Sequence, residues 1–478
     1  MIKKALLVFW LGTLIPAILT AQEKKVWTLE ECIDYALEHN ISLKKQFLNT
    51  QYQEELLRQS KLNILPSINA GATHGYNWGK RVDPFTNEFA TDRIRSNDLN
   101  LSGSLNLFSG FQQLNEIRRN KLALMKAQLD ADYYEDDLSI QVATEYLQVL
   151  YYTEYVEMAQ NQLAISKLQV DRTRKMVDAG TLAKGDLLTI EAQYASEELS
   201  LVQAQNNLTL AYLNLSQLME LQSPEGLTVE QPELGLLDPV NLLTPDQIYA
   251  AAIGVRPEIK SAEYNVESSL LGLKIAQGAL YPRLTLTGLI GTGYSGANLI
   301  GNDTIYLPPT PFAQTASGEL VYPLGQQFGF GSYDPKPFND QINDNLYESV
   351  GLRLSVPIFN GWSARSQVAQ AKIGIENANL DLELQKNTLY KIIQQAYNDA
   401  VSAMNQFRAA TKKVDATAES FKYAEQKFNV GMINSVDYNN AKKEYNNALS
   451  ELIQAKYEYV FRTTVIDFYM GKPLTLNR

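Results

Sequence analysis

The sequence predicts a mixed α and β membrane protein in which one helix–strand–strand–helix unit occurs twice. Three observations support this fold class. The chain has two helical segments of unusual length, two pairs of strands with alternating apolar and polar residues, and a constant spacing between equivalent motifs in its two halves.

The longest helical segment, Phe111–Ala179, contains 69 residues without proline or glycine and ends at Gly180. At about 1.5 Å of rise per residue, such a helix is roughly 100 Å long. A second copy, Trp362–Val430, contains one glycine and ends at Gly431. A proline-free run follows each copy, so we expect two long helical hairpins.

Apolar residues in the first long helix recur at alternating four- and three-residue steps, a spacing typical of helices packed as a coiled coil. These residues are Leu138, Val142, Val149, Tyr152, Val156, Ala159, Leu163 and Val170. Glu145 and Ser166 fall on the same seam although both are polar.

A first helical segment, Leu29–Leu62, is ended by Pro66, after which the period changes to two. Ile68, Ala70, Ala72, His74, Tyr76 and Trp78 share one face, and polar or small residues share the other. The alternation resumes after a polar loop. The pattern predicts a hairpin of strands with one apolar and one polar face.

The same order of elements recurs in the second half. Pro282 stands 216 residues after Pro66, whereas Gly431 stands 251 residues after Gly180. The second repeat therefore carries 35 extra residues, all between its two strands. We expect this segment, about 296–345, to be an extracellular loop, and it has no recognisable calcium-binding spacing.

These patterns divide the chain into four segments. They are a signal peptide at 1–21, a first repeat at 22–223 (strands about 67–78 and 97–108, helical hairpin about 111–221), an equatorial connector at 224–244, and a second repeat at 245–478 (strands about 283–295 and 346–358, helical hairpin about 362–470).

Composition excludes several classes of function. The net charge of −11 disfavours binding to nucleic acid. One cysteine rules out an intramolecular disulfide, and with two histidines it leaves little for a transition-metal site. The segment Gly291–Gly296 matches G-x-G-x-x-G, but no helix follows it, so we do not expect a dinucleotide cofactor. With no catalytic motif present, the protein is not expected to be an enzyme.

Four strands are too few to close a membrane barrel, and an open sheet leaves unpaired edges in lipid. Two chains supply about 8 strands, and a barrel of that size is filled by its own side chains. Three chains supply about 12 strands and leave room for a pore. A solid helical bundle is the alternative for the helices, but the polar strand face favours a wet interior.

The chain resembles the TolC-type outer membrane efflux proteins along essentially its whole mature length. The resemblance rests on the duplicated order of elements, on Leu65-Pro66 and Tyr281-Pro282 at the strand entries, and on Phe359-Asn360-Gly361 after the last strand. It implies a trimer with a 12-strand outer-membrane β-barrel and a long periplasmic α-helical barrel. Such proteins are passive exit ducts that dock periplasmic adaptors and inner-membrane transporters.

The hairpin tips are the candidate gate. Gly180 and Gly431 fit a left-handed position at the end of a helix. Asp186 and Asp437 lie near the start of the return helices, where capping or a helix-dipole interaction is the structural explanation. In a trimer, three copies of Asp437 would form a ring that favours cations.

The resemblance also shows where the tip departs from the family pattern. Relatives carry a second acidic residue where this chain has Asn440, and an arginine where it has Ile433. A salt bridge from Asp186 to that position is therefore not expected, and Lys184 is an alternative partner.

Three aromatic residues near strand ends, Tyr76, Trp78 and Tyr294, fit the aromatic belt of a membrane interface. Packing within loops is the alternative.

The function predicted from these features is an outer membrane exit duct of a tripartite efflux or type I secretion system. Small molecules or peptides would pass from the periplasm to the exterior through a gate at the helix tips. The alternative is a periplasmic coiled-coil adaptor or structural protein without a pore. The sequence does not identify the cargo.

Overall fold

The computed structural model describes residues 25–90, 93–232 and 243–476. The predicted signal peptide and the middle of the predicted connector lie outside these residues. The chain forms two compact units. The helical unit comprises the chain up to Thr50, Lys126–Glu263 and the chain from Asp381, and the strand unit comprises Gln51–Met125 and Tyr264–Leu380. Each unit therefore combines equivalent parts of both repeats.

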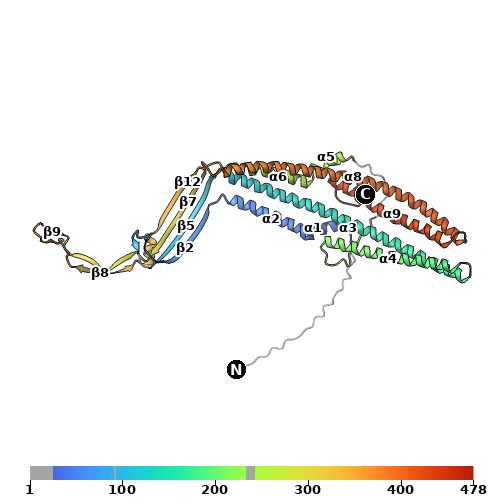
Figure 1. The fold of residues 1–478 in the computed structure, drawn as a ribbon, viewed down its shortest axis with the longest axis horizontal. Coiled ribbons are helices and arrows are strands. Elements are labelled where there is room, and N and C mark those ends of the chain that lie inside the picture. The colour runs from blue at the N-terminus through green and yellow to red at the C-terminus, as the bar shows by residue number, and fades with distance from the viewer. Residues whose placement is uncertain (1–24, 91–92, 233–242, 477–478) are drawn as a thin grey trace, which may run out of the picture. The chain divides into compact units, whose positions relative to one another are not determined.

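The centre of the strand unit is a four-stranded antiparallel sheet (Figure 1). Its strands, in spatial order, are β12 (Tyr347–Ser355), β7 (Arg283–Ser295), β5 (Ile94–Ser109) and β2 (Ser67–Asn77). The predicted strands agree with these bounds to within about three residues. Among the described residues, β2 and β12 each have one neighbouring strand in this sheet, so both of its edges are open.

The strand pairings in the sheet follow the sequence repeat. In the first repeat Ser67 pairs with Ser104, and in the second Arg283 pairs with Ser355. These pairs are related by the same offsets of 216 and 251 that separate the motifs in the sequence. The two strand hairpins are therefore equivalent residue by residue.

One face of the sheet exposes large apolar side chains. On the edge strand β12, Val350 is 81% exposed, Leu352 66% and Leu354 65%. This apolar face is not covered within the chain, so it needs either lipid or another chain to remove it from water.

The segment between β7 and β12, for which the sequence predicts an extracellular loop, contains strands and a helix that the sequence did not predict. It contains a hairpin of β8 (Leu299–Leu307) and β11 (Gln327–Pro335), the short strands β9 (Ala313–Gln314) and β10 (Leu320–Val321), and helix α7 (Phe338–Asp344). Glycines in β8 and β11 interrupt the alternation of apolar and polar residues, so the sequence pattern does not indicate these strands. A Cβ on Gly301 would lie 2.1 Å from the Phe330 ring, because side chains of the neighbouring strand cross over the glycine positions. Two further short strands, β3 (Arg81–Val82) and β4 (Phe89–Ala90), pair in the loop after β2.

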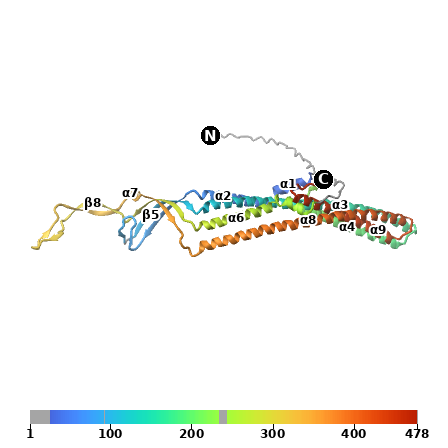
Figure 2. The same cartoon turned by 90° about the horizontal axis from the view of Figure 1, so that it is seen from above.

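The helices form the two predicted hairpins. The first joins α3 (Gln112–Asp178) to α4 (Lys184–Leu218), and the second joins α8 (Ser363–Asn429) to α9 (Ser435–Tyr469). Figures 1 and 2 both show α4 beside α3 and α9 beside α8. Both long helices contain 67 residues, and both return helices contain 35.

The predicted first helix is two helices, α1 (Leu29–His39) and α2 (Ile41–Leu62). Asn40 interrupts it with a ψ of 125°. Its side chain accepts a hydrogen bond from the Leu43 amide at 3.0 Å and donates one to the Leu218 carbonyl at 3.3 Å. The start of α2 therefore meets the end of α4.

The second repeat has the corresponding pair α5 (Pro245–Ala252) and α6 (Pro257–Gly278). A short parallel pair, β1 (Val26–Trp27) and β6 (Thr228–Val229), lies in the helical unit. Its largest core packs α1 and α4 against α3 around Cys32, Tyr146 and Leu215. Within the described ranges, none of the helices is both long enough and apolar enough to span a membrane.

Candidate functional site at the helix tips

The two hairpin tips turn in the same way. Gly180 has a φ of +75° and Gly431 a φ of +74°. In both tips the residue after the glycine donates its amide to the carbonyl five residues earlier, at 2.9 and 2.8 Å. These bonds satisfy carbonyl groups at the end of each long helix. The left-handed conformation predicted for both glycines is confirmed.

Asp186 and Asp437 lie in the first turns of α4 and α9, but neither carboxylate caps its helix. The residue that precedes α4 is Ala183, which has no side-chain cap. The residue that precedes α9 is Asn434, whose Oδ1 accepts the Asp437 amide at 2.8 Å. Of the two structural explanations, the helix dipole is therefore the one that fits both residues.

The two tips are joined by a direct hydrogen bond. Ser435, the first residue of α9, donates its hydroxyl to Oδ1 of Asp186 on α4 at 2.7 Å. The serine is 2% exposed. In the described part of the chain, the polar partner of Asp186 is therefore this serine rather than the Lys184 side chain.

Asp437 and Asn440 are both exposed on α9. Ile433, at the position where relatives carry an arginine, packs instead against an apolar cluster. Among the described residues, the exposed carboxylate of Asp437 takes part in none of the contacts that hold the tip within one chain. Its role in a ring around a constriction stays a prediction.

An apolar cluster lies behind the tips. It brings together Val170 of α3, Ile190 of α4, Phe428 of α8 and Tyr438 of α9. The Phe428 and Tyr438 rings are stacked with their centroids 4.8 Å apart. Burial raises the pKa of the Tyr438 phenol, and its hydroxyl has no hydrogen-bond partner among the described residues. The cluster therefore holds all four long helices together.

One turn further along α9 is a buried polar contact that sequence reasoning did not find. The ammonium group of Lys442 lies 2.9 Å from Oε1 of Glu197 on α4 and also contacts the hydroxyl of Ser166 on α3. Lys442 is 1% exposed, Ser166 3% and Glu197 8%. The signal that was present is the polar Ser166 on the otherwise apolar seam of the first long helix.

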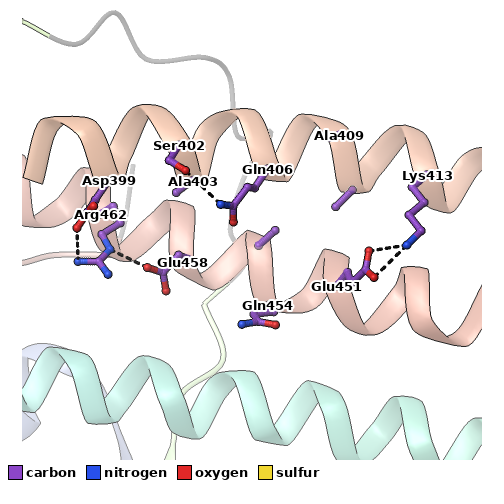
Figure 3. Close-up of a pocket in the computed structure, with 12 residues that line it drawn as sticks. Asp399, Ser402, Ala403, Gln406, Ala409, Lys413, Glu451, Gln454, Glu458 and Arg462 are labelled. Atoms are coloured by element: carbon purple, nitrogen blue, oxygen red, sulfur yellow. Dashed lines mark hydrogen bonds and ion pairs between the residues drawn. The ribbon is translucent and has the colours of Figure 1, made fainter.

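The α8–α9 hairpin carries a surface groove of about 640 Å³, shown in Figure 3. Alanine side chains line it, and ion pairs span the two helices along it: Lys413 with Glu451 at 2.8 Å and Arg462 with Asp399 at 3.1 Å. Such exposed pairs contribute only about 0–1 kcal/mol each. Their significance is that they tie α8 to α9 within one hairpin.

The predicted interface aromatics separate into two groups. Tyr76 is 44% exposed and Trp78 71% exposed, with ring centroids 6.4 Å apart at the end of β2. Tyr294 is only 6% exposed, because it packs against Phe338 of α7 and under the guanidinium group of Arg95. For Tyr294 the alternative of packing within the loops applies, and for the other two the belt stays a prediction.

The glycine-rich segment Gly291–Gly296 lies in β7 and the turn after it. A Cβ on Gly291 would lie 2.5 Å from the Tyr347 ring, and one on Gly293 would lie 2.1 Å from the Phe85 ring. These glycines therefore make room for aromatic side chains that cross the strand. Among the described residues, no group of three or more His, Cys, Asp or Glu side chains is placed to hold a metal ion.

Comparison with known proteins gives one consistent result. The model of the family "Outer membrane efflux protein" matches residues 32–220 and 248–472. The chain is 25% identical to outer membrane protein TolC of Escherichia coli (strain K12), over 92% of this chain and 80% of TolC. It is 21% identical to outer membrane efflux protein BepC of Brucella suis, over 93% of this chain and 85% of BepC. Its fold is similar to the crystal structure of VceC from Vibrio cholerae, with a TM-score of 0.73 and 16% identity over 93% of this chain and 96% of VceC.

Proposed function

Because the chain belongs to the outer membrane efflux protein family, we propose that it is the outer membrane exit duct of a tripartite efflux or type I secretion system. The four-stranded sheet lies in the outer membrane and the helical hairpins lie in the periplasm. Small molecules or peptides pass through the duct passively, and a gate at the helix tips controls their entry.

The observation that carries this proposal is the four-stranded sheet with two open edges and an uncovered apolar face. Unpaired backbone groups are too costly to leave in lipid, so the edges must pair with other strands. We propose that three copies of the chain close a barrel of about 12 strands, since two copies would give a barrel filled by its own side chains.

The internal repeat supports this closure and specifies its geometry. Within the chain, β5 of the first repeat pairs with β7 of the second. By the equivalence of the repeats, β12 of one copy should pair with β2 of the next copy in the same way. This would join the two open edges of the sheet.

The offsets of the repeat predict which residues would meet. The observed pair of Gly103 with Gly288 corresponds to Leu354 opposite Ala72 of the neighbouring copy. The full set of apolar-face pairs, given as the residue on β12 and the residue on the neighbour's β2, is Val350 with Tyr76, Leu352 with His74, Leu354 with Ala72, and Val356 (just beyond β12) with Ala70. Every pair places two residues of the apolar face together, as a lipid-facing surface requires.

The strand-to-helix junctions support the same arrangement. Gly110 and Gly361 are equivalent and both have a φ of +63°. A Cβ on Gly110 would lie 2.3 Å from the Gly278 carbonyl oxygen at the end of α6, whereas Gly361 has nothing within 4 Å. The contact missing at Gly361 corresponds to the end of α2, at Leu62, of the neighbouring copy.

At the periplasmic end, the duct would receive a periplasmic adaptor and an inner-membrane transporter, as the resemblance implies. In the trimer, Asp437 from each chain would line the constriction and favour cations. Contact with the partner proteins would separate the helix tips and open the duct.

Conductance in a planar lipid bilayer tests this function. Protein extracted from membranes with detergent should run as a trimer and should form ion-conducting channels when it is reconstituted. Material that leaves the membrane without detergent and does not conduct would support the alternative, a periplasmic adaptor or structural protein, and would overturn the duct.

A further inference from the structure

We propose that Ser166, Glu197 and Lys442 form a buried clamp that fastens the second helical hairpin to the first and holds the tip closed. This inference rests on the proposed function, because it assigns the contact that must break when the gate opens. We call these three residues the Lys442 clamp.

The geometry of the clamp is that of a complete ion pair. The ammonium group of Lys442 lies 2.9 Å from Oε1 and 3.1 Å from Oε2 of Glu197. The Ser166 hydroxyl contacts both the ammonium group and the carboxylate. Gln193 donates its amide to Oε1 of Glu197 at 2.9 Å. Both carboxylate oxygens therefore have partners, and three different helices contribute to one site.

The clamp belongs to a buried stripe on α9. Ser435, Tyr438 and Lys442 follow one another at three- and four-residue steps, which puts them on the same face of the helix. All three are at most 2% exposed. Ser435 contacts Asp186 on α4, and Tyr438 packs in the cluster with Val170 and Ile190. The whole stripe therefore faces the first hairpin, and Lys442 is its only charged residue.

Two other ion pairs join the helices of a single hairpin. Arg174 and Glu191 link α3 to α4 at 2.9 Å, and Lys413 and Glu451 link α8 to α9 at 2.8 Å. Each of these pairs ties the two helices of its hairpin together. Lys456 and Glu154 do link the two hairpins, at 2.9 Å, but they are partly solvated. The Lys442 clamp is the most deeply buried ion pair in the described residues.

The energetics of a buried ion pair suit a contact that must be broken. Removing both charges from water is costly, and the attraction between them offsets that cost only while the pair is complete. When the hairpins separate, water solvates both groups again, so the desolvation free energy is recovered. Apolar groups gain no such favourable hydration when they separate, so an apolar contact of the same size would hold the tip shut more firmly. Burial lowers the pKa of Lys442, whereas the negative charge of Glu197 and its hydrogen bond to the ammonium group act in the opposite direction.

A buried ion pair of this kind predicts opposite effects for single and double substitutions. Lys442→Met leaves the Glu197 carboxylate buried without a cation, so the closed tip should become less stable. Combining Lys442→Met with Glu197→Met makes the contact apolar, so closure should return to the wild-type level or exceed it.

The measurement is the open probability of single channels in planar bilayers. We expect Lys442→Met and Glu197→Met each to raise it by at least about tenfold, and the double variant to be as closed as the wild type or more so. Lys413→Met is the matched control. It breaks an exposed pair within one hairpin and should leave the open probability unchanged within about twofold.

A disulfide separates gate opening from general loosening. In a Cys32→Ala background, Asp186→Cys with Ser435→Cys replaces an observed contact between the hairpins by a covalent one. Oxidation should suppress the extra opening of Lys442→Met, and reduction should restore it. If oxidation leaves that conductance unchanged, the effect does not come from separation of the hairpins and the clamp proposal is wrong.

The outcomes also distinguish this proposal from the one on which it rests. A wild-type protein that forms no channel overturns the duct. A gated wild-type channel whose open probability is unchanged by Lys442→Met overturns the clamp and leaves the duct standing. Single variants that open the channel without recovery in the double variant likewise reject the clamp, because the effect is then simple loss of packing.

Discussion

Gly110 and Gly278 approach so closely that a Cβ on Gly278 would lie 2.6 Å from the carbonyl oxygen of Gly110. Gly278→Ala should therefore destabilise the protein by about 1–3 kcal/mol, the usual cost of overpacking. The matched control is Gly272→Ala on the same helix, which meets nothing within 4 Å. It should stabilise α6 by roughly 0.5–1 kcal/mol, because alanine is the better helix former.

Thermal unfolding of the detergent-solubilised protein, followed by circular dichroism, measures this difference. Equal midpoints for the two alanine variants would contradict a tight junction between the end of α6 and the start of α3.

The edge pairing between copies predicts a specific cross-link. In a Cys32→Ala background, Leu354→Cys with Ala72→Cys places two thiols opposite each other on neighbouring chains. Oxidation in membranes should convert most of the chain into covalent oligomers, with a trimer as the largest closed product. The products are measured by electrophoresis without reducing agent.

An off-register pair provides the control for that cross-link. Ile68 lies four residues before Ala72, about 13 Å along the strand, which is beyond the reach of a disulfide. Leu354→Cys with Ile68→Cys should therefore form no covalent oligomer under the same conditions. Cross-linking of the two pairs with equal yield would refute the register derived from the repeat.

Much of the strand unit follows from the sequence because the evidence there is local. Proline at the strand entry and alternation of residues such as Ile68 and Ala70 fix both the strand and its faces. The hairpin of β8 and β11 escaped this reasoning because glycines such as Gly301 replace side chains where Phe330 crosses from the other strand. A cross-strand contact of that kind has no local signature.

The Lys442 clamp near the tip is also a contact between distant segments that the sequence does not reveal. Ser166 is visible in the sequence as a polar residue on an apolar seam, which indicates a polar neighbour but does not identify it. Glu197 and Lys442 are 245 residues apart, and each is one of several charged residues on its helix. Which of these charges is buried depends on how the two hairpins pack, and a single sequence does not contain that information.

The single cysteine should be unreactive in the folded protein. Cys32 is fully buried in α1, and burial raises the pKa of its thiol to about 12. At pH 8 only about one molecule in ten thousand would carry the reactive thiolate, even if a reagent reached it. We expect no labelling by a maleimide in mild detergent and full labelling after denaturation, as measured by mass spectrometry. Rapid labelling of the folded protein would show that α1 detaches from its core.

The carboxylate of Asp437 should influence which ions enter the duct. It is exposed, and its helix is capped by Asn434, so Asp437→Asn removes a charge without removing the cap. If three copies line the constriction, this variant should have a lower cation-to-anion permeability ratio and weaker block by multivalent cations. Reversal potentials in a salt gradient measure the first effect, and titration with a trivalent cation measures the second.

The matched control for Asp437→Asn is a substitution of the capping residue, Asn434. Asn434→Ala should cost about 1 kcal/mol of helix stability, because the Asp437 amide loses its acceptor. It leaves the carboxylate in place, so the permeability ratio should match that of the wild type. If the permeability ratio of Asp437→Asn also matches that of the wild type, the carboxylate only interacts favourably with the positive end of the α9 dipole. The selectivity of the duct must then come from other residues.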